Sequence, residues 1–108
     1  MKYIKKFKNI DSPEVGDYVI FNTNYVNDET YIKLGKFLND NLGIIDKKYK
    51  PNYGEKYRIE VKYDNIPEDL KNSFRRNGTI DFREDMIYEF GKTPEEVYMK
   101  VNAKKYNL

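Results

Sequence analysis

The sequence predicts a single α+β domain built on a small, strongly bent antiparallel sheet of five strands. One helix is inserted between the first two strands and another ends the chain. Three observations favour this class. At 108 residues the chain has the size of one domain. Short β-branched and aromatic segments recur between turn formers. The connections between most of these segments are too short for parallel crossovers.

The first two strands flank the predicted insertion. The first 15 residues are expected to form an N-terminal arm, either flexible or docked on the domain. After Gly16, the segment 17–21 is rich in β-branched and aromatic residues, which predicts a strand. A helix is expected over 29–42, because Tyr31, Leu34, Leu38 and Leu42 recur with helical spacing and Gly43 fits as its stop. The second strand starts at Ile44 and ends before the loop 50–55.

The second half of the chain predicts three more strands. In the segment 57–63, Tyr57, Ile59, Val61 and Tyr63 alternate with charged residues, so one face of the strand is expected to be buried. A short helical turn is expected to begin at 66–70. Strands over 79–83 and 86–90 follow, joined by a tight corner at 83–85.

The C-terminal helix has a clear start signal. Thr93, Pro94 and Glu96 supply a cap, a first-turn proline and a capping-box carboxylate, which predicts a helix over 94–105. Val97 and Val101 are expected to face inward. Leu70 and Phe74, four residues apart in the preceding segment, are likewise expected to pack inward.

Composition restricts the chemistry. The chain has no Cys and no His, which removes disulfides, thiolate metal sites and the side chain best suited to proton transfer near neutral pH. Nucleotide-loop, metalloprotease and calcium-loop motifs are not found. The acidic trio Asp81, Glu84 and Asp85 is interpreted as a solvated turn beside Arg83. We therefore expect no enzyme, no cofactor and no metal.

Location and charge limit the partners. No apolar run is long enough to span a membrane, and the Lys-rich start lacks the apolar stretch of a signal peptide, so a cytoplasmic protein without a membrane partner is expected. The net charge of +2 is far from the excess of a dedicated nucleic-acid binder.

Several segments together resemble a known group of proteins. These are the opening 16–20, the strand 57–63 and the corner 82–88, which resemble the small SH3-like barrel proteins, many of them uncharacterised, of phages and AT-rich bacteria. The resemblance covers about residues 14–90 and has no diagnostic site motif. It implies a barrel that acts as a binding module, here with an added helix between strands 1 and 2.

Two kinds of binding site are predicted. The favoured function is stoichiometric protein binding, as in a phage-encoded, anti-CRISPR-like inhibitor of a host defence complex. Its candidate contacts lie on the inserted helix and in Tyr-bearing loops: Tyr25, Lys33, Lys36, Asn39, Asp40, Tyr49 and Tyr53. The inserted helix alternatively only plugs the open end of the barrel, and the loop tyrosines alternatively only pack.

The alternative function is an SH3-like nucleic-acid-binding module. Its candidate residues are Lys47, Lys48, Lys50, Arg75 and Arg76, which combine with Tyr49 and Tyr53 if the tips of the second and fourth strands meet on one side. The competing interpretation is that these cations only keep a β-edge soluble.

Overall fold

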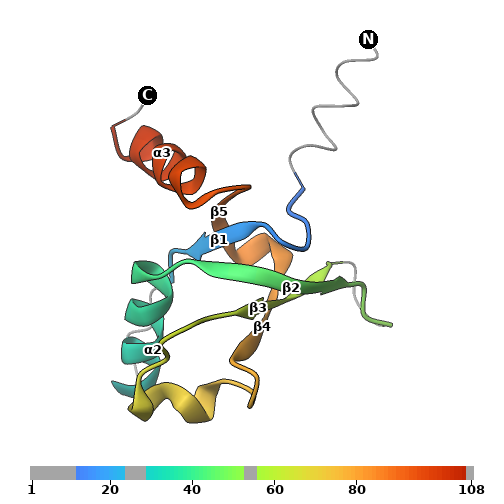
Figure 1. The fold of residues 1–108 in the computed structure, drawn as a ribbon, viewed down its shortest axis with the longest axis vertical. Helices are drawn as coiled ribbons and strands as arrows, with labels where there is room; N and C mark the ends of the chain where they lie inside the picture. The colour runs from blue at the N-terminus through green and yellow to red at the C-terminus, as the bar shows by residue number, and fades with distance from the viewer. Residues whose placement is uncertain (1–11, 24–28, 53–55, 107–108) are drawn as a thin grey trace.

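The computed structural model describes residues 12–23, 29–52 and 56–106. It is a small α+β fold in which one antiparallel sheet is accompanied by helices (Figure 1). Two candidate contact residues, Tyr25 and Tyr53, and most of the predicted N-terminal arm lie outside the described residues.

The sheet contains five strands in the order β4-β3-β2-β1-β5, and all neighbours are antiparallel. Each predicted strand is present within one or two residues of its predicted position. The strands are β1 (Tyr18–Phe21), β2 (Gly43–Tyr49), β3 (Arg58–Lys62), β4 (Thr79–Arg83) and β5 (Ile87–Gly91).

The sheet is bent, and the link between its two edge strands shows why. β4 and β5 are joined by the short 3-10 turn η2 (Glu84–Met86), which spans about 14 Å when fully extended. In a flat sheet the two edges would be about 19 Å apart. The ring centroids of Phe21 in β1 and Phe82 in β4 are only 4.4 Å apart, although two strands lie between them. The sheet is not closed, because β4 and β5 do not pair with each other.

The core fills the concave side of this sheet. Ile59 and Val61 of β3 are both fully buried, as their alternation predicts. The inserted helix α2 (Glu29–Asp40) adds Leu34 and Leu38, and the 3-10 turn η1 (Glu68–Ser73) adds Leu70. The predicted inward positions of Leu70 and Phe74 are therefore confirmed, since half-buried Phe74 packs against the same core.

Three details of the predicted pattern are wrong. The inserted helix ends at Asp40, and Gly43 begins β2 instead of stopping the helix. A Cβ on Gly43 would clash with Cγ1 of Val61 and would lie 2.7 Å from Cζ of Tyr63, so the close approach of these two side chains explains the glycine. Tyr31 and Tyr57 were expected to face inward but are 55% and 43% exposed, since each lies at the end of its element and a tyrosine tolerates water at its hydroxyl.

The last helix, α3 (Pro94–Lys105), begins and ends where the sequence predicts. Thr93 caps it, because its Oγ1 accepts a hydrogen bond from the Glu96 amide at 3.1 Å. Val97 is fully buried against the sheet, and Val101 is half-buried. The helix contacts β5 and β1, so it lies at the opposite edge of the sheet from η1 (Figure 1).

Candidate binding surfaces

The predicted contacts on α2 divide into exposed charges and one internal anchor. Lys36 and Asp40 are exposed, and the Nζ atom of exposed Lys33 lies 3.3 Å from Oδ2 of Asp69 in η1. Asn39 instead ties the helix to the end of the β1 segment. Its Oδ1 accepts from the Thr23 amide at 2.7 Å, and its Nδ2 donates to the Thr23 carbonyl at 2.8 Å. Asn39 therefore holds the insertion in place and is not free for a partner.

The end of the second strand and the start of the fourth strand, where the predicted cations lie, do not meet. Tyr49 at the end of β2 lies level with Arg58 and, beyond it, with Arg83 at the end of β4. The turn that carries Arg75 and Arg76 comes before β4, at the other end of β3. The two predicted halves of the nucleic-acid site are thus separated by the length of β3.

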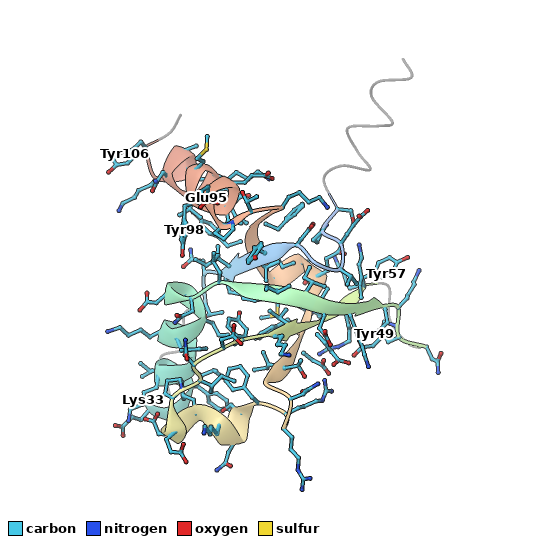
Figure 2. The ribbon with its side chains drawn as sticks, viewed as in Figure 1. Lys33, Tyr49, Tyr57, Glu95, Tyr98 and Tyr106 are labelled. Atoms are coloured by element: carbon cyan, nitrogen blue, oxygen red, sulfur yellow. The ribbon has the colours of Figure 1, made fainter. Side chains whose placement is uncertain are left out.

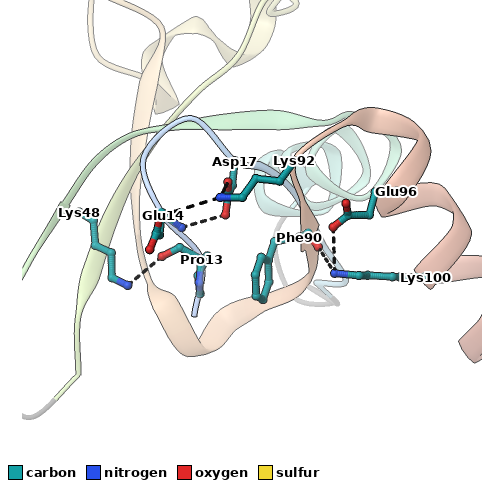
Figure 3. Close-up of polar contacts among 8 residues, drawn as sticks. All are labelled: Pro13, Glu14, Asp17, Lys48, Phe90, Lys92, Glu96 and Lys100. Atoms are coloured by element: carbon teal, nitrogen blue, oxygen red, sulfur yellow. Dashed lines mark hydrogen bonds and ion pairs between the residues drawn. The ribbon is translucent and has the colours of Figure 1, made fainter. Parts of the chain in front are cut away.

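Lys48 is part of the internal structure. Its Nζ donates to the Pro13 carbonyl at 2.8 Å and to Ser12 Oγ at 2.9 Å, and it pairs with Oε2 of Glu84 at 2.9 Å. Figure 3 shows the contact with Pro13. This lysine joins the entering chain to the corner between β4 and β5, so its charge is compensated.

Arg75 is similarly occupied. Its guanidinium donates to both carboxylate oxygens of Asp81, at 2.9 and 2.6 Å, and lies 3.2 Å from Oε1 of Glu60. The hydrogen bond to Asp81 is the largest cause of the raised pKa of Arg75, and the negative charge of Asp81 is the next largest. The neighbouring Arg76 is exposed and has no acidic partner in the described part of the chain.

Unpaired cations gather on the convex side of the sheet. Arg58 and Lys62 alternate with the buried residues of β3, and Lys47, which follows a bulge in β2, lies on the same side opposite Glu60. No described acidic group forms an ion pair with these three cations. We call these three residues the basic face. Tyr49 lies beside Arg58 and is 37% exposed, and Ile44 beside Lys62 is 39% exposed. The second aromatic predicted at this tip, Tyr53, lies outside the described residues. Tyr57, directly before β3, lies on the other side of the hairpin under the ammonium groups of Lys48 and Lys50.

A second surface, which the sequence interpretation missed, lies on α3. Tyr98, Met99 and Tyr106 are 46%, 72% and 65% exposed. Helical geometry places Met99 on the side opposite buried Val97 and Tyr98 on the flank, about 100° round the helix from Val97, and Tyr106 is the C-cap residue directly after the helix. Figure 2 shows Tyr98 and Tyr106 with Glu95 along this helix. We call Tyr98, Met99 and Tyr106 the α3 face. The sequence could have indicated this surface, because the spacing of these residues places them away from the side of the helix that carries Val97 and Val101.

The inner side of α3 is held largely by lysines. Lys100 Nζ donates to the Phe90 carbonyl at 2.8 Å, and Lys104 Nζ donates to the Tyr88 carbonyl at 3.0 Å. Each ammonium also lies over the ring of the same residue of β5. These contacts cover the outer carbonyls of edge strand β5, so α3 protects that edge.

A buried carboxylate fixes the chain as it enters β1. Asp17 is 2% exposed, and its two oxygens accept from Lys92 Nζ at 2.8 Å and from the Glu14 amide at 2.9 Å (Figure 3). The hydrogen bond from Lys92 to Asp17 is the largest cause of the raised pKa of Lys92. Because both oxygens of this carboxylate accept a hydrogen bond, we assign the cluster a structural role.

The acidic trio near the corner is also engaged in ion pairs. Asp81 pairs with Arg75, Glu84 with Lys48, and Asp85 with Lys56 and Arg83. Among the described residues, no group of three or more acidic side chains is arranged to hold a metal ion.

Comparison with known protein families, curated proteins and solved structures gives no match for this chain. None of the described helices is long and apolar enough to cross a membrane.

Proposed function

We propose that this protein acts stoichiometrically, by binding another protein through the α3 face. The observation that carries the proposal is the exposure of Tyr98 on the flank of α3, of Met99 on its outer side and of Tyr106 at its C-terminal end. Large aromatic and thioether side chains that stay in contact with water are the residues that dominate protein interfaces. The partner that fits them is a protein with an apolar groove that receives one face of a helix.

The packing of α3 supports this use. Val97, Lys100 and Lys104 fix the inner side of the helix, so the outer residues are presented on a rigid element and lose little further freedom on binding. Glu95 lies on the same outer side at the first turn, so the face combines an apolar centre with a charged end.

Binding rather than catalysis also agrees with the polar groups. The chain has no His and no Cys. The half-buried carboxylates of Glu60, Asp81, Glu84 and Glu89 are all engaged in ion pairs. None of these carboxylates is left as a free general base.

The biological role that we propose is inhibition of a host defence complex by a phage-encoded, anti-CRISPR-like protein. This rests on the sequence resemblance and the residue composition alone. We also propose that the fold is an open variant of the SH3-like barrel, supported by the bent five-stranded sheet and the short corner between β4 and β5.

The test is affinity capture with the full chain as bait in lysate of the source cells, with and without nuclease. The proposal expects a protein to be retained after nuclease treatment. The Tyr98→Ala, Tyr106→Ala double variant is expected to lose it. Ile32→Ala, which shortens another exposed apolar side chain on α2, is the matched control and should retain it.

A direct measurement must follow with the purified partner, because capture alone does not locate the site. Calorimetry should give one partner per chain for the wild type, and a loss of more than 2 kcal/mol of binding free energy, of the order typical of aromatic hot spots, for the double variant. Equal affinities for the wild type and the double variant would remove α3 as the site. Release of the partner by nuclease would remove direct protein binding.

A further inference from the structure

A concave region lies between the end of β3, η1 and the start of β4. Its volume is about 710 Å³, within the range of small-ligand sites. Its lining includes the cations Lys62, Lys71, Arg75 and Arg76, a single carboxylate, Asp64, and the half-buried ring of Phe74. We call this region the hollow.

The cations of the hollow are not equivalent. Lys71 pairs with Glu68 at 2.9 Å, and Arg75 is held by Asp81 and Glu60. Lys62 and Arg76 have no acidic partner in the described part of the chain. The hollow therefore presents two positive charges without an ion pair, against the one carboxylate of Asp64, beside an aromatic ring. This excess of positive charge suits a phosphate attached to a flat, apolar group.

The position of Arg76 is fixed by its turn. The Gly78 amide donates to the Arg75 carbonyl at 2.9 Å, the Arg75 amide donates to the Thr79 carbonyl at 2.8 Å, and the Tyr63 amide donates to the Gly78 carbonyl at 3.0 Å. Gly78 has a φ of +82°, a conformation that glycine adopts without strain. These bonds tie the turn to β3, so the Arg76 backbone is already ordered before a ligand arrives.

The hollow is continuous with the basic face. Lys62 belongs to both, and Arg58 lies four residues back on the same side of β3, about 13 Å away along the strand. Lys47 of β2 lies beside Glu60 between them, and Tyr49 lies beside Arg58. A row of unpaired cations thus runs from Arg76 to an exposed tyrosine, which is the combination that binds single strands by phosphate contact and base stacking.

From this arrangement we propose that the protein has a second binding site, for single-stranded nucleic acid. One nucleotide occupies the hollow, with its phosphate at Lys62 and Arg76, and the strand continues along the basic face to Tyr49. This site is separate from the α3 face and does not depend on the protein-binding function. It keeps Arg76 and Lys47 of the residues that the sequence suggested, and it replaces Lys48 and Arg75, whose charges are compensated, with Lys62 and Arg58.

The experiment is a salt titration of binding to a fluorescently labelled oligothymidine, followed by anisotropy. The Lys62→Ala, Arg76→Ala variant should bind about tenfold more weakly at low salt. Its slope of log K against log salt should fall by about 0.7, because the one phosphate contact that the two cations share is lost. The matched control is Lys36→Ala, Lys105→Ala, which removes two exposed cations from α2 and α3 and should leave the slope unchanged.

Further arms separate the possible ligands. Tyr49→Ala should weaken strand binding but not binding of free thymidine monophosphate, whereas the double variant should weaken both. Polyglutamate should compete poorly with the labelled strand. A melting curve for each variant shows that it is folded, and Lys62→Gln with Arg76→Gln replaces the alanine pair if that pair unfolds.

Four results would overturn the proposal. The first is that the wild type does not bind the strand at low salt, and the second is that the control pair loses as much slope as the Lys62→Ala, Arg76→Ala variant. The third is that polyglutamate displaces the strand as effectively as unlabelled oligothymidine does. The fourth is that the protein binds the free nucleotide but not the strand. The third result would assign the surface to an acidic protein, and the fourth would reduce the site to the hollow alone.

Discussion

The two long helices of this protein have the same length but are attached to the sheet in different ways. α2 and α3 each contain 12 residues. α2 buries Leu34 and Leu38 in the core, whereas the only described residue of α3 that is buried is Val97. α3 is held in addition by lysine bonds to the carbonyls of β5. A helix attached through polar contacts can keep its large apolar side chains in water, and this makes α3 the better candidate for partner binding.

The largest effect should come from the core side of α2. Leu38→Ala removes a fully buried side chain and should lower the free energy of unfolding by about 2–5 kcal/mol, through lost burial and the cavity left behind. Urea denaturation followed by circular dichroism measures this. A loss smaller than that of the lysine variant described next would show that α2 is not the better anchored helix.

A smaller loss is expected when the polar attachment of α3 is removed. Lys100→Met with Lys104→Met keeps helix propensity and stem length but loses two hydrogen bonds to β5, which should cost roughly 1 kcal/mol because both side chains are partly exposed. Lys105→Met on the same helix is the control and should change little. Hydrogen exchange should become faster in α3 and β5 of the double variant; unchanged exchange would mean that Val97 alone holds the helix.

A still smaller effect at neutral pH is expected at Tyr63, whose ring lies 5.5 Å from that of Phe37 in α2. Its hydroxyl is buried and has no hydrogen-bond partner among the described residues, so Tyr63→Phe should change stability by less than about 1 kcal/mol. Burial raises the pKa of this hydroxyl above its ordinary value of 10.0. The unfolded chain therefore releases the proton first, and wild-type stability should fall as the pH rises above about 10.

The pH dependence gives this prediction a clear comparison. Unfolding titrations of the wild type and Tyr63→Phe between neutral and alkaline pH should diverge above about pH 10, with the phenylalanine variant losing less stability. Parallel curves would show that the Tyr63 hydroxyl reaches solvent when folded.

The smallest effect on stability should come from the α3 face. Tyr98→Ala with Tyr106→Ala removes side chains that are about half exposed or more, so the free energy of unfolding should change by at most about 0.5 kcal/mol in the double variant. The same variant is expected to lose the protein partner. A large loss of stability here would mean that these tyrosines belong to the fold and would weaken the comparison between the helices.

Local signals in the sequence predicted most elements of the fold. Thr93, Pro94 and Glu96 predicted the start of α3, and the alternation around Ile59 and Val61 predicted the buried side of β3, because both signals depend only on neighbouring residues. The end of α2 was not predicted, since Gly43 serves the packing of Tyr63, a residue distant in sequence. Sheet closure was also not predictable from the spacing of strands.

The candidate sites depended more on contacts between distant residues. Lys48 and Arg75 look free in the sequence, but Glu84, Pro13, Asp81 and Glu60 compensate them after folding. The sequence pattern placed Lys62 and Arg58 only on the solvent-facing side of a strand, although they are among the cations that remain without an ion pair in the described structure. Such differences arise because a charge is available to a ligand only after the fold has distributed its ion pairs.

The pairing of β5 with β1 also sets the order in which the molecule can be completed. These strands come from opposite ends of the described chain, whereas β2, β3 and β4 follow one another and pair as neighbours. During synthesis β1 can pair early with β2, and β2, β3 and β4 can pair in turn, while the contact between β1 and β5 must wait until β5 has left the ribosome. α3 follows β5 directly, so its aromatic surface is presented only on a finished sheet, and unfinished chains would not compete for the partner.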